Sequence, residues 1–327
     1  MSQTLAIYCR DVARVYDSLE ALRHVNLAVA PGEFVSLVGA SGSGKSTLSA
    51  VLAHQLERIA LRDRRYRDFT QRGLRHALRE VIASAFQCVV FLERRRGPDG
   101  AFRRFVTQIN EVNGHVVDGV TVRVARASDD DVARVRRRFA MVFQNHALLD
   151  SLTVYDNVAF PLREETDLDE RAIRARVTEV LTELGVDAAA SKVPAELSGG
   201  MAKRVGIARA MVTEPEILVY DEPTSGLDPV TSRTVDGLIE RMRAEHFVTS
   251  VVITHDMVSA YDVSDRVLML ARGKVVIDDV PERVFASHNA DVLPFAVSSG
   301  LDIAHLAPRK HRRTAAEIRL AWKARRG

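Results

Sequence analysis

The chain has 327 residues, a formal net charge of +3 and 46% hydrophobic residues. This length can bury one large hydrophobic core or two modest ones, and so small a net charge excludes a uniformly basic or acidic chain. Its two cysteines, Cys9 and Cys88, lie far apart without clustered histidines, which excludes a disulfide framework and a cysteine-based zinc site.

The first constrained stretch is a glycine-rich loop at residues 39–46, the phosphate loop, with the sequence Gly-Ala-Ser-Gly-Ser-Gly-Lys-Ser. It fits the pattern G-x-x-x-x-G-K-[ST], whose backbone N–H groups turn toward the β- and γ-phosphates of a nucleotide, while the Lys adds charge and the Ser ligates Mg²⁺. A buried strand at 33–38 and a helix at 47–52 are expected on its two sides, which disfavours a chance glycine turn. The candidate nucleotide-binding residues here are Gly39, Ala40, Ser41, Gly42, Ser43, Gly44, Lys45, Ser46 and Thr47.

Residues 54–112 combine a predicted helix with a predicted hairpin. An apolar stripe with i, i+3 and i+4 spacing between residues 74 and 89 favours a helix. Two apolar segments, 88–92 and 102–106, flank a Gly-Pro-Asp-Gly turn at 97–100 and favour a β-hairpin. From residue 58 to 104 there are 13 arginines against five acidic residues. Such a surface could bind nucleic acid or anionic lipid, or be a solvated helix face with no partner.

The middle of the chain carries a polar residue and then helical periodicity. Gln144 follows the apolar run 139–143. From residue 169 to 184 apolar side chains fall on one face of a predicted helix, namely Ile173, Val177, Val180, Leu181 and Leu184. An apolar groove between two such helices would accept a partner helix.

Three later stretches place polar residues at the ends of regular elements. Ser198-Gly199-Gly200 open a helix whose free N–H groups and positive dipole end can face an anion, although alone they would indicate only an N-cap and a flexible loop. The apolar run 217–220 ends in Asp221 and Glu222, which could also be a strand meeting its loop. The apolar run 251–253 is followed by Thr254 and His255, and a lone histidine is more often structural than catalytic.

The C-terminal residues 301–327 contain eight basic residues against Asp302 and Glu317. Residues 315–322 are expected to form a short helix that carries Trp322, the only tryptophan of the chain. Such a tail could touch anionic lipid or a neighbouring subunit, or it could be a poorly ordered solubilising end.

Together these stretches resemble the motifs of ABC-type ATPases, each present once and in family order across residues 5–290. Leu197–Met201 with the following residues 202–210 resembles the family's signature motif. Residues 217–222 resemble its Walker B segment, and residues 223–229 resemble its D-loop. The resemblance covers one complete ATPase domain rather than a tandem pair or a fragment.

The resemblance implies roles for individual residues. Asp221 would hold Mg²⁺ through water, and Glu222 would act as the general base on the attacking water. His255 would be the switch histidine that contacts the γ-phosphate, and Gln144 would ligate Mg²⁺ and sense a transmembrane partner. Tyr16 would stack on the adenine ring, although a tyrosine on a strand is usually just packed.

The resemblance also implies an active site shared between two subunits. Ser198, Gly199 and Gly200 of one subunit would contact the γ-phosphate held by the other, and Asp228 would cross the interface. Two copies, or one copy with a homologue, would therefore enclose two ATP and Mg²⁺. Closure would drive a separate membrane permease, and hydrolysis would reset the dimer.

The implied fold is an α/β P-loop NTPase with a RecA-like core, an antiparallel β subdomain and an α-helical signature subdomain at about residues 145–212. The ATPase domain would cover residues 1–290, followed by a basic extension at 291–327. Lys45 and Gln144 lie 99 residues apart, much further than family members usually show. Residues from about 54 to 112 are therefore expected to be an insertion.

The expected function is that of the ATP-hydrolysing subunit of a membrane transporter, with the permease gripped through Gln144–Leu162. Met201 stands where most relatives carry Gln, and with residues 203–211 and 220–231 it resembles the Mla/Mce group, so a phospholipid or sterol is the expected substrate class. The alternatives are an importer for a small solute such as an amino acid or phosphonate, and a DNA-handling ABC ATPase that uses the arginine-rich insertion. The sequence shows no cysteine-based zinc-ligand set, heptad-bearing coiled coil or second ATPase half, which disfavours nucleic acid as a partner.

The chain shows neither a basic-then-apolar leader nor an apolar stretch of the roughly 20 residues that span a bilayer. Two cysteines without pairing signals suit a reducing cytosol. We therefore expect a cytoplasmic protein that is peripheral on the inner face of the cell membrane and needs a partner to supply the channel.

Overall fold

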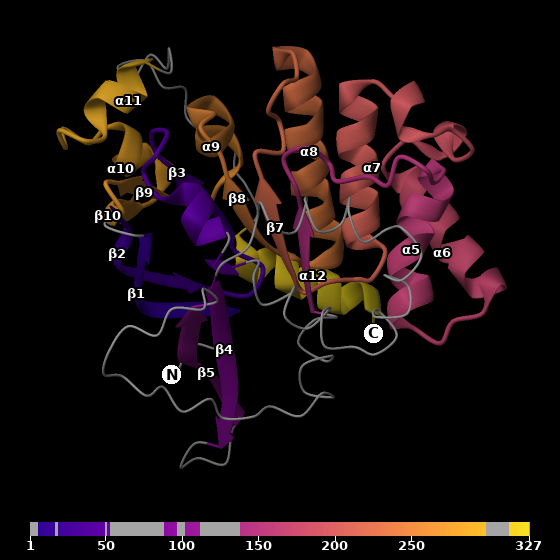
Figure 1. The fold of residues 1–327 in the computed structure, drawn as a ribbon, viewed down its shortest axis with the longest axis horizontal. Coiled ribbons are helices and arrows are strands. Elements are labelled where there is room, and N and C mark those ends of the chain that lie inside the picture. Colours follow the sequence, from indigo (N-terminus) through magenta and orange to yellow (C-terminus); the bar gives the residue numbers. More distant parts are fainter. Residues whose placement is uncertain are drawn as a thin grey trace. The chain divides into compact units, whose positions relative to one another are not determined.

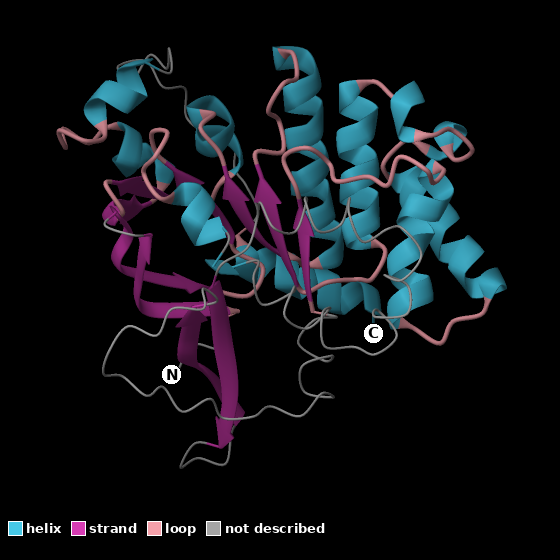
Figure 2. Cartoon of the chain, viewed as in Figure 1, coloured by secondary structure: helices cyan, strands magenta, loops and turns pink. Residues whose placement is uncertain are grey.

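The computed structural model describes residues 6–16, 19–49, 51–52, 88–96, 102–111, 138–298 and 314–326. The chain divides into two compact units, drawn in Figures 1 and 2. The first unit comprises Met1–Ala30, Ala40–Arg136 and Leu270–Val275, and the second comprises Pro31–Gly39, Arg137–Met269 and Val276–Gly327. The predicted helix between residues 74 and 89 lies almost entirely outside the described residues, so the boundaries of the insertion stay a prediction.

The first unit contains two antiparallel strand pairs. Strand β1 (Ile7–Tyr16) pairs with β2 (Leu19–Val29), and β4 (Cys88–Arg96) pairs with β5 (Phe102–Glu111). Along β2 the buried side chains Leu22, Val25, Leu27 and Val29 are separated by more exposed ones, as a strand with one covered face requires. Both β4 and β5 extend beyond the apolar segments 88–92 and 102–106 that the sequence singled out.

Most of a six-stranded sheet, in the order β10-β9-β3-β8-β7-β6 (Figure 2), lies in the second unit, while the end of β9 and the start of β10 belong to the first. Neighbouring strands from β9 to β6 run parallel. Every residue of β3 and of β8 is buried, which explains their unbroken apolar character, because a parallel sheet is covered on both faces. The strands are β3 (Phe34–Val38), β6 (Phe139–Val142), β7 (Ile217–Asp221), β8 (Thr249–Ile253), β9 (Arg266–Ala271) and β10 (Lys274–Asp279).

Four helices form the larger hydrophobic core of this unit together with the sheet. They are α5 (Val154–Glu165), α6 (Glu170–Glu183), α7 (Gly199–Met211) and α8 (Pro229–His246), and Figure 1 shows them beside β6, β7 and β8. The predicted stripe on α6 is buried as expected, with Val177 fully enclosed. Each of these helices begins at a side chain that accepts a backbone N–H, namely Thr153, Asp169, Ser198 and Asp228.

A second core lies between β3, β9 and the three short helices α9 (Met257–Val263), α10 (Pro281–Phe285) and α11 (Leu293–Ser298). Tyr261 and Phe285 meet edge to face in it, with ring centroids 5.4 Å apart. Nowhere in the described part of the chain is a helix both long and apolar enough to cross a membrane.

The C-terminal helix α12 (Ala315–Arg326) packs on α8. Ile318 is buried, and the Trp322 ring lies 5.7 Å from the ring of Phe247, the residue that directly follows α8. The helix expected at residues 315–322 is thus observed, and it is longer than expected; a contact of the tail with lipid or a neighbouring subunit stays a prediction.

Helix α8 is anchored near its C-terminal end by a buried arginine. Arg243 is 1% exposed, pairs with Asp265 and donates from Nε to the carbonyl of Gly32 at 2.9 Å. A buried guanidinium needs such partners, because desolvation of an unpaired charge costs several kcal/mol, on the order of 3–5 when one partner is removed. The pair fixes α8 against the amino end of β3.

Candidate functional site

Four of the predicted site residues of the second unit lie where its parallel strands end. Gly39 follows β3, Gln144 lies two residues after β6, Glu222 directly follows β7, and His255 lies two residues after β8. Because parallel strands present their carboxyl ends at one edge of the sheet, these four residues share that edge. Ligands of open α/β sheets bind outside this edge.

Glu222 is the most tightly positioned of them. Its backbone has φ +48°, in the left-handed region that few non-glycine residues adopt, and its N–H donates to the Ile253 carbonyl at 2.9 Å. One carboxylate oxygen, Oε2, lies 2.8 Å from Nδ1 of His255 and 3.4 Å from the Thr254 hydroxyl. The Glu222 side chain is 13% exposed and that of His255 is 65% exposed. Strained backbone of this kind gathers at functional sites.

Lys203, within α7, holds Glu222 and Gln144 in place, a role that the sequence pattern does not predict. Its side chain is 1% exposed, and its Nζ donates to the carbonyls of Gln144 at 2.6 Å and Glu222 at 3.1 Å. Burial lowers the pKa of Lys203, and the charges of Glu222 and Asp221 oppose that shift. One ammonium group therefore joins two of the predicted site residues through their backbones.

A second basic residue of α7 holds the turn that follows Gln144. Arg209 donates to the carbonyls of Ala147 at 2.6 Å and His146 at 2.9 Å. His146 and Ala147 both have positive φ, at +58° and +48°. The Gln144 side chain itself is exposed, with Nε2 3.4 Å from the Ser225 hydroxyl. Residues 144–147 thus form a strained turn. Lys203 of α7 binds the first residue of this turn and Arg209 of α7 binds the last two.

The helix openings at Ser198 and Asp228 lie close together. A Cβ on Gly200 would come within 2.6 Å of Thr231, and one on Gly199 would meet Leu227 at 3.4 Å. Ser198 and Asp228 are both exposed, and each caps its own helix. Hydrogen bonds from Thr231 and Val230 lower the pKa of Asp228. Two positive helix ends with exposed caps are a suitable contact for an anion.

The phosphate loop from Ala40 onward lies in the first unit. Lys45 Nζ donates to the Ala40 carbonyl at 3.0 Å, which closes the loop on itself. Gly44 has φ +105°, and a Cβ there would lie 2.5 Å from the Ala21 carbonyl oxygen, so only glycine fits. Helical conformation begins at Lys45, two residues before the expected start. Ser46 is exposed and Thr47 half-buried.

Tyr16, also in the first unit, already has one face of its ring covered. The Arg14 guanidinium lies over the ring, 4.7 Å from its centroid. Its predicted stacking on adenine stays a prediction.

The donor types fit the expected cofactors. The oxygen ligands predicted for the metal come from the Ser46 hydroxyl, the Gln144 amide and the Asp221 carboxylate, and hard oxygen donors are those that Mg²⁺ prefers. The positive φ of Gly42 and Gly44 gives the loop the backbone freedom that a phosphate cradle requires.

A surface hollow of about 250 Å³ lies beside the 144–147 turn. Its walls come from the segment after Gln144 and from the segment that leads into α7, and they include Asn145, Leu148, Asp150, Pro194, Ala195 and Leu197. One wall of this hollow belongs to the Gln144–Leu162 region that was predicted to bind a permease, and the other wall lies outside that region.

Comparison with known proteins identifies the class. The family model described as ABC transporter matches residues 22–97 and 101–225, more than half of the chain. The chain belongs to this family and is an ATP-binding cassette. Cassettes of this family bind ATP with Mg²⁺ and hydrolyse it, so the predicted fold class, ATPase class and cofactors are confirmed.

Similar proteins differ in the substrate that their names give. The intermembrane phospholipid transport system ATP-binding protein MlaF of Haemophilus influenzae is 37% identical over 53% of this chain and 65% of its own length. The chloroplastic protein TRIGALACTOSYLDIACYLGLYCEROL 3 of Arabidopsis thaliana is 30% identical over 90% of this chain and 74% of its own. The methionine import ATP-binding protein MetN of Caulobacter vibrioides is 35% identical over 86% of this chain and 69% of its own length. The match thus spans just under two thirds of the first of these relatives.

Solved structures agree on the fold. The protein cbiO1 of Clostridium perfringens, described as part of the ABC transporter complex cbiONQ, has a TM-score of 0.60 and 24% identity over 87% of this chain and 92% of its own. The ATP-binding cassette MJ0796, in a dimeric post-hydrolysis state bound to ADP and Pi, has a TM-score of 0.56 and 26% identity over 84% and 98%.

Proposed function

We propose that this chain is the ATP-hydrolysing subunit of a membrane transporter and drives a separate permease. The observation that carries the proposal is the contact between Glu222 and His255 at the carboxyl edge of a cassette sheet. A positioned carboxylate can take the proton of an attacking water, and the exposed imidazole can contact the phosphate that leaves. In this proposal Glu222 is the general base, Asp221 holds Mg²⁺ through water, and the phosphate loop binds the β- and γ-phosphates.

The proposal includes a dimer that encloses two ATP and Mg²⁺. Its support is the exposure of Ser198 and Asp228 at two adjacent helix openings, together with the dimeric state reported for the cassette MJ0796. Ser198, Gly199 and Gly200 would contact the γ-phosphate bound by the other copy, with Asp228 at the interface. Bound at such an interface, ATP would favour the closed dimer, and its hydrolysis would favour the open one.

The permease would dock on the hollow beside the 144–147 turn. Leu148 and Leu197 contribute apolar surface there and pack against the main core. The clamp formed by Lys203 and Arg209 connects this surface rigidly to Glu222, because both side chains bind the turn and Lys203 also binds the Glu222 carbonyl. Binding of the permease at the hollow would thereby be coupled to ATP hydrolysis at Glu222 through Lys203. The chain would then lie at the inner face of the membrane as a peripheral protein.

Affinity capture from detergent-solubilised membranes tests this function. Wild-type chain should retain a protein with several membrane-spanning helices, identified by mass spectrometry. Ala195→Arg places a bulky charge in the hollow and should lose that protein, while Ala175→Arg, on the exposed face of α6, should keep it. Both variants should still bind ATP. Failure of the wild type to retain any such protein, or equal capture by both variants, would contradict the proposal.

Lipid is the substrate class that we propose for the transporter. Its support is the similarity to the phospholipid transport protein MlaF and the Met201 position next to the signature glycines. The second candidate is import of an amino acid, favoured by the 35% identity to a methionine import protein over most of the chain. In a reconstituted complex with the captured permease, phospholipid should stimulate ATP hydrolysis. Stimulation by methionine instead would favour the second candidate.

A further inference from the structure

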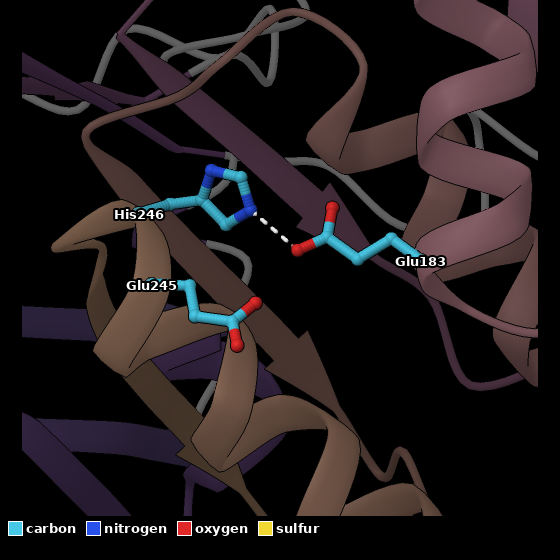
Figure 3. Close-up of side chains that lie close together, drawn as sticks. All are labelled: Glu183, Glu245 and His246. Carbon is cyan, nitrogen blue, oxygen red and sulfur yellow. Dashed lines mark hydrogen bonds and ion pairs between the residues drawn. The ribbon is translucent and has the colours of Figure 1, made fainter.

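Three side chains that commonly bind metal ions meet at the ends of two helices (Figure 3). Glu183 is the last residue of α6, and Glu245 and His246 are the last two residues of α8. Nε2 of His246 lies 2.8 Å from Oε1 of Glu183, and one ligand atom from each of the three residues lies within 4.8 Å of the others. This group, the helix-end cluster, lies in the second unit and has no part in the proposed hydrolysis.

The electrostatic setting of the helix-end cluster favours a cation. The C-terminal ends of α6 and α8 both lie at the cluster, and each helix contributes the negative end of its dipole there. The carboxyl groups of Glu183 and Glu245 add to this attraction for a cation. Burial and the neighbouring Glu183 carboxyl raise the pKa of Glu245, whereas the nearby charges of Arg241 and His246 lower it.

The spacing suits tetrahedral coordination. Zinc bonds to histidine nitrogen and carboxylate oxygen measure about 2.0–2.2 Å, so neighbouring ligands in a tetrahedron lie about 3.4 Å apart. The observed Glu183–His246 separation of 2.8 Å needs only a small side-chain rotation to reach that value. The Glu183 and His246 side chains are 21% and 28% exposed, which leaves the ligand atoms accessible from solvent.

The donor types distinguish between metals. A histidine nitrogen suits zinc and its neighbours in the first transition row, while Mg²⁺ and Ca²⁺ prefer sites made of oxygen alone. We propose that Glu183, Glu245 and His246 form a binding site for a divalent transition metal, Zn²⁺ in particular, with water as the fourth ligand. The metal would join the end of α6 to the end of α8 and stabilise the fold, because it binds the folded chain alone.

The only tryptophan of the chain lies close enough to report binding. Phe247 follows His246 directly, and its ring lies 5.7 Å from that of Trp322. A metal bound by His246 would shift this aromatic pair, so the fluorescence of Trp322 should change when the helix-end cluster is occupied. This readout does not depend on ATP hydrolysis.

Titration of the full-length, tag-free chain tests the site. After treatment with chelator and in the absence of nucleotide, Zn²⁺ should bind with one equivalent per chain by calorimetry, raise the melting temperature and change Trp322 fluorescence. Cobalt(II) at the same site should give the visible absorption of a tetrahedral complex. Glu183→Gln and His246→Asn should each weaken zinc binding by more than about tenfold, because even outer-sphere partners of a metal contribute that much.

Two matched controls separate this site from surface binding. Glu179→Gln lies on α6 one turn before Glu183, and His288→Asn lies in an exposed loop. Both should bind zinc as the wild type does. Metal-free melting curves show whether each cluster variant is folded. Zinc binding that is absent from the wild type, or that is unchanged in both folded cluster variants, would overturn the proposal.

Discussion

The Nδ1 atom of His255 lies 2.8 Å from Oε2 of Glu222, although 33 residues separate the two in the chain. The register of the sheet explains this contact. Asp221 at the end of β7 is paired with Ile253 at the end of β8, so the residues that follow each strand leave the sheet side by side. The strained backbone of Glu222 then turns its carboxylate toward the histidine.

Replacement of Glu222 by Gln keeps the shape of the side chain and removes its ability to accept a proton. We expect ATP hydrolysis to fall by roughly 10²–10⁴-fold, the usual contribution of a general base, while ATP binding persists. Because the reset step fails, an ATP-bound dimer should accumulate and elute earlier in size-exclusion chromatography. Glu282→Gln, an exposed change on α10, is the control. A variant that stays monomeric at saturating ATP would argue against the shared active site.

Replacement of Lys203 by Met tests the clamp between α7 and the sheet edge. Two charge-assisted hydrogen bonds to partly buried carbonyls would be lost, and we expect the free energy of unfolding to fall by about 1–3 kcal/mol. The exposed Lys192→Met should change it by less than about 0.5 kcal/mol. Urea denaturation measures both. Equal stability of the two variants would show that the contacts of Lys203 contribute nothing.

The order of the elements and the positions of the site residues could be predicted from the sequence because they depend on local patterns. The apolar runs before Gly39 and Glu222 became the buried strands β3 and β7, and the residues that follow them stand at the strand ends as expected. Capping chemistry likewise located the start of α7 at Ser198. In each case a few adjacent residues carry the whole signal.

Contacts between residues far apart in the chain could not be predicted from local sequence patterns. Lys203 binds carbonyls of residues 59 and 19 positions away, and backbone carbonyls have no identity in the sequence. The packing of Trp322 on Phe247 depends on where α12 meets α8, which the periodicity of a short basic helix does not specify. The helix-end cluster arises in the same way, from the ends of two helices that are far apart in the chain.

Gly44 and Gly42 form a matched pair in the phosphate loop. Both have positive φ, but a Cβ on Gly44 would lie 2.5 Å from a backbone oxygen of Ala21, whereas a Cβ on Gly42 meets nothing within 4 Å. Gly42→Ala should therefore cost only the strain of its backbone, about 1–2 kcal/mol, and retain nucleotide binding. Gly44→Ala must move the loop and should lose the ATP-induced rise in melting temperature. Loss of nucleotide binding in Gly42→Ala but not in Gly44→Ala would show that the contact with Ala21 does not limit the loop.

Asp236 gives the stability of the fold a dependence on pH. It is 8% exposed on α8 and accepts a hydrogen bond from the Ser259 hydroxyl at 2.9 Å. Burial raises its pKa from 3.8 to about 7, and the charges of Asp256 and Asp262 act in the same direction, while the bond from Ser259 opposes them. Between those two values the folded chain binds one more proton than the unfolded chain. Stability should therefore fall as the pH rises through this window, and the loss ends above pH 7.

Asp236→Asn removes the ionisable group and keeps an acceptor for Ser259. Relative to the wild type its free energy of unfolding should increase with pH between 5 and 7, by at most about 1.4 kcal/mol per pH unit, and the difference should stay constant above that range. Urea denaturation at pH 5, 6, 7 and 8 measures this difference. The exposed Asp150→Asn should show no such trend. A constant difference between Asp236→Asn and the wild type across the four pH values would mean that Asp236 does not change its protonation on folding.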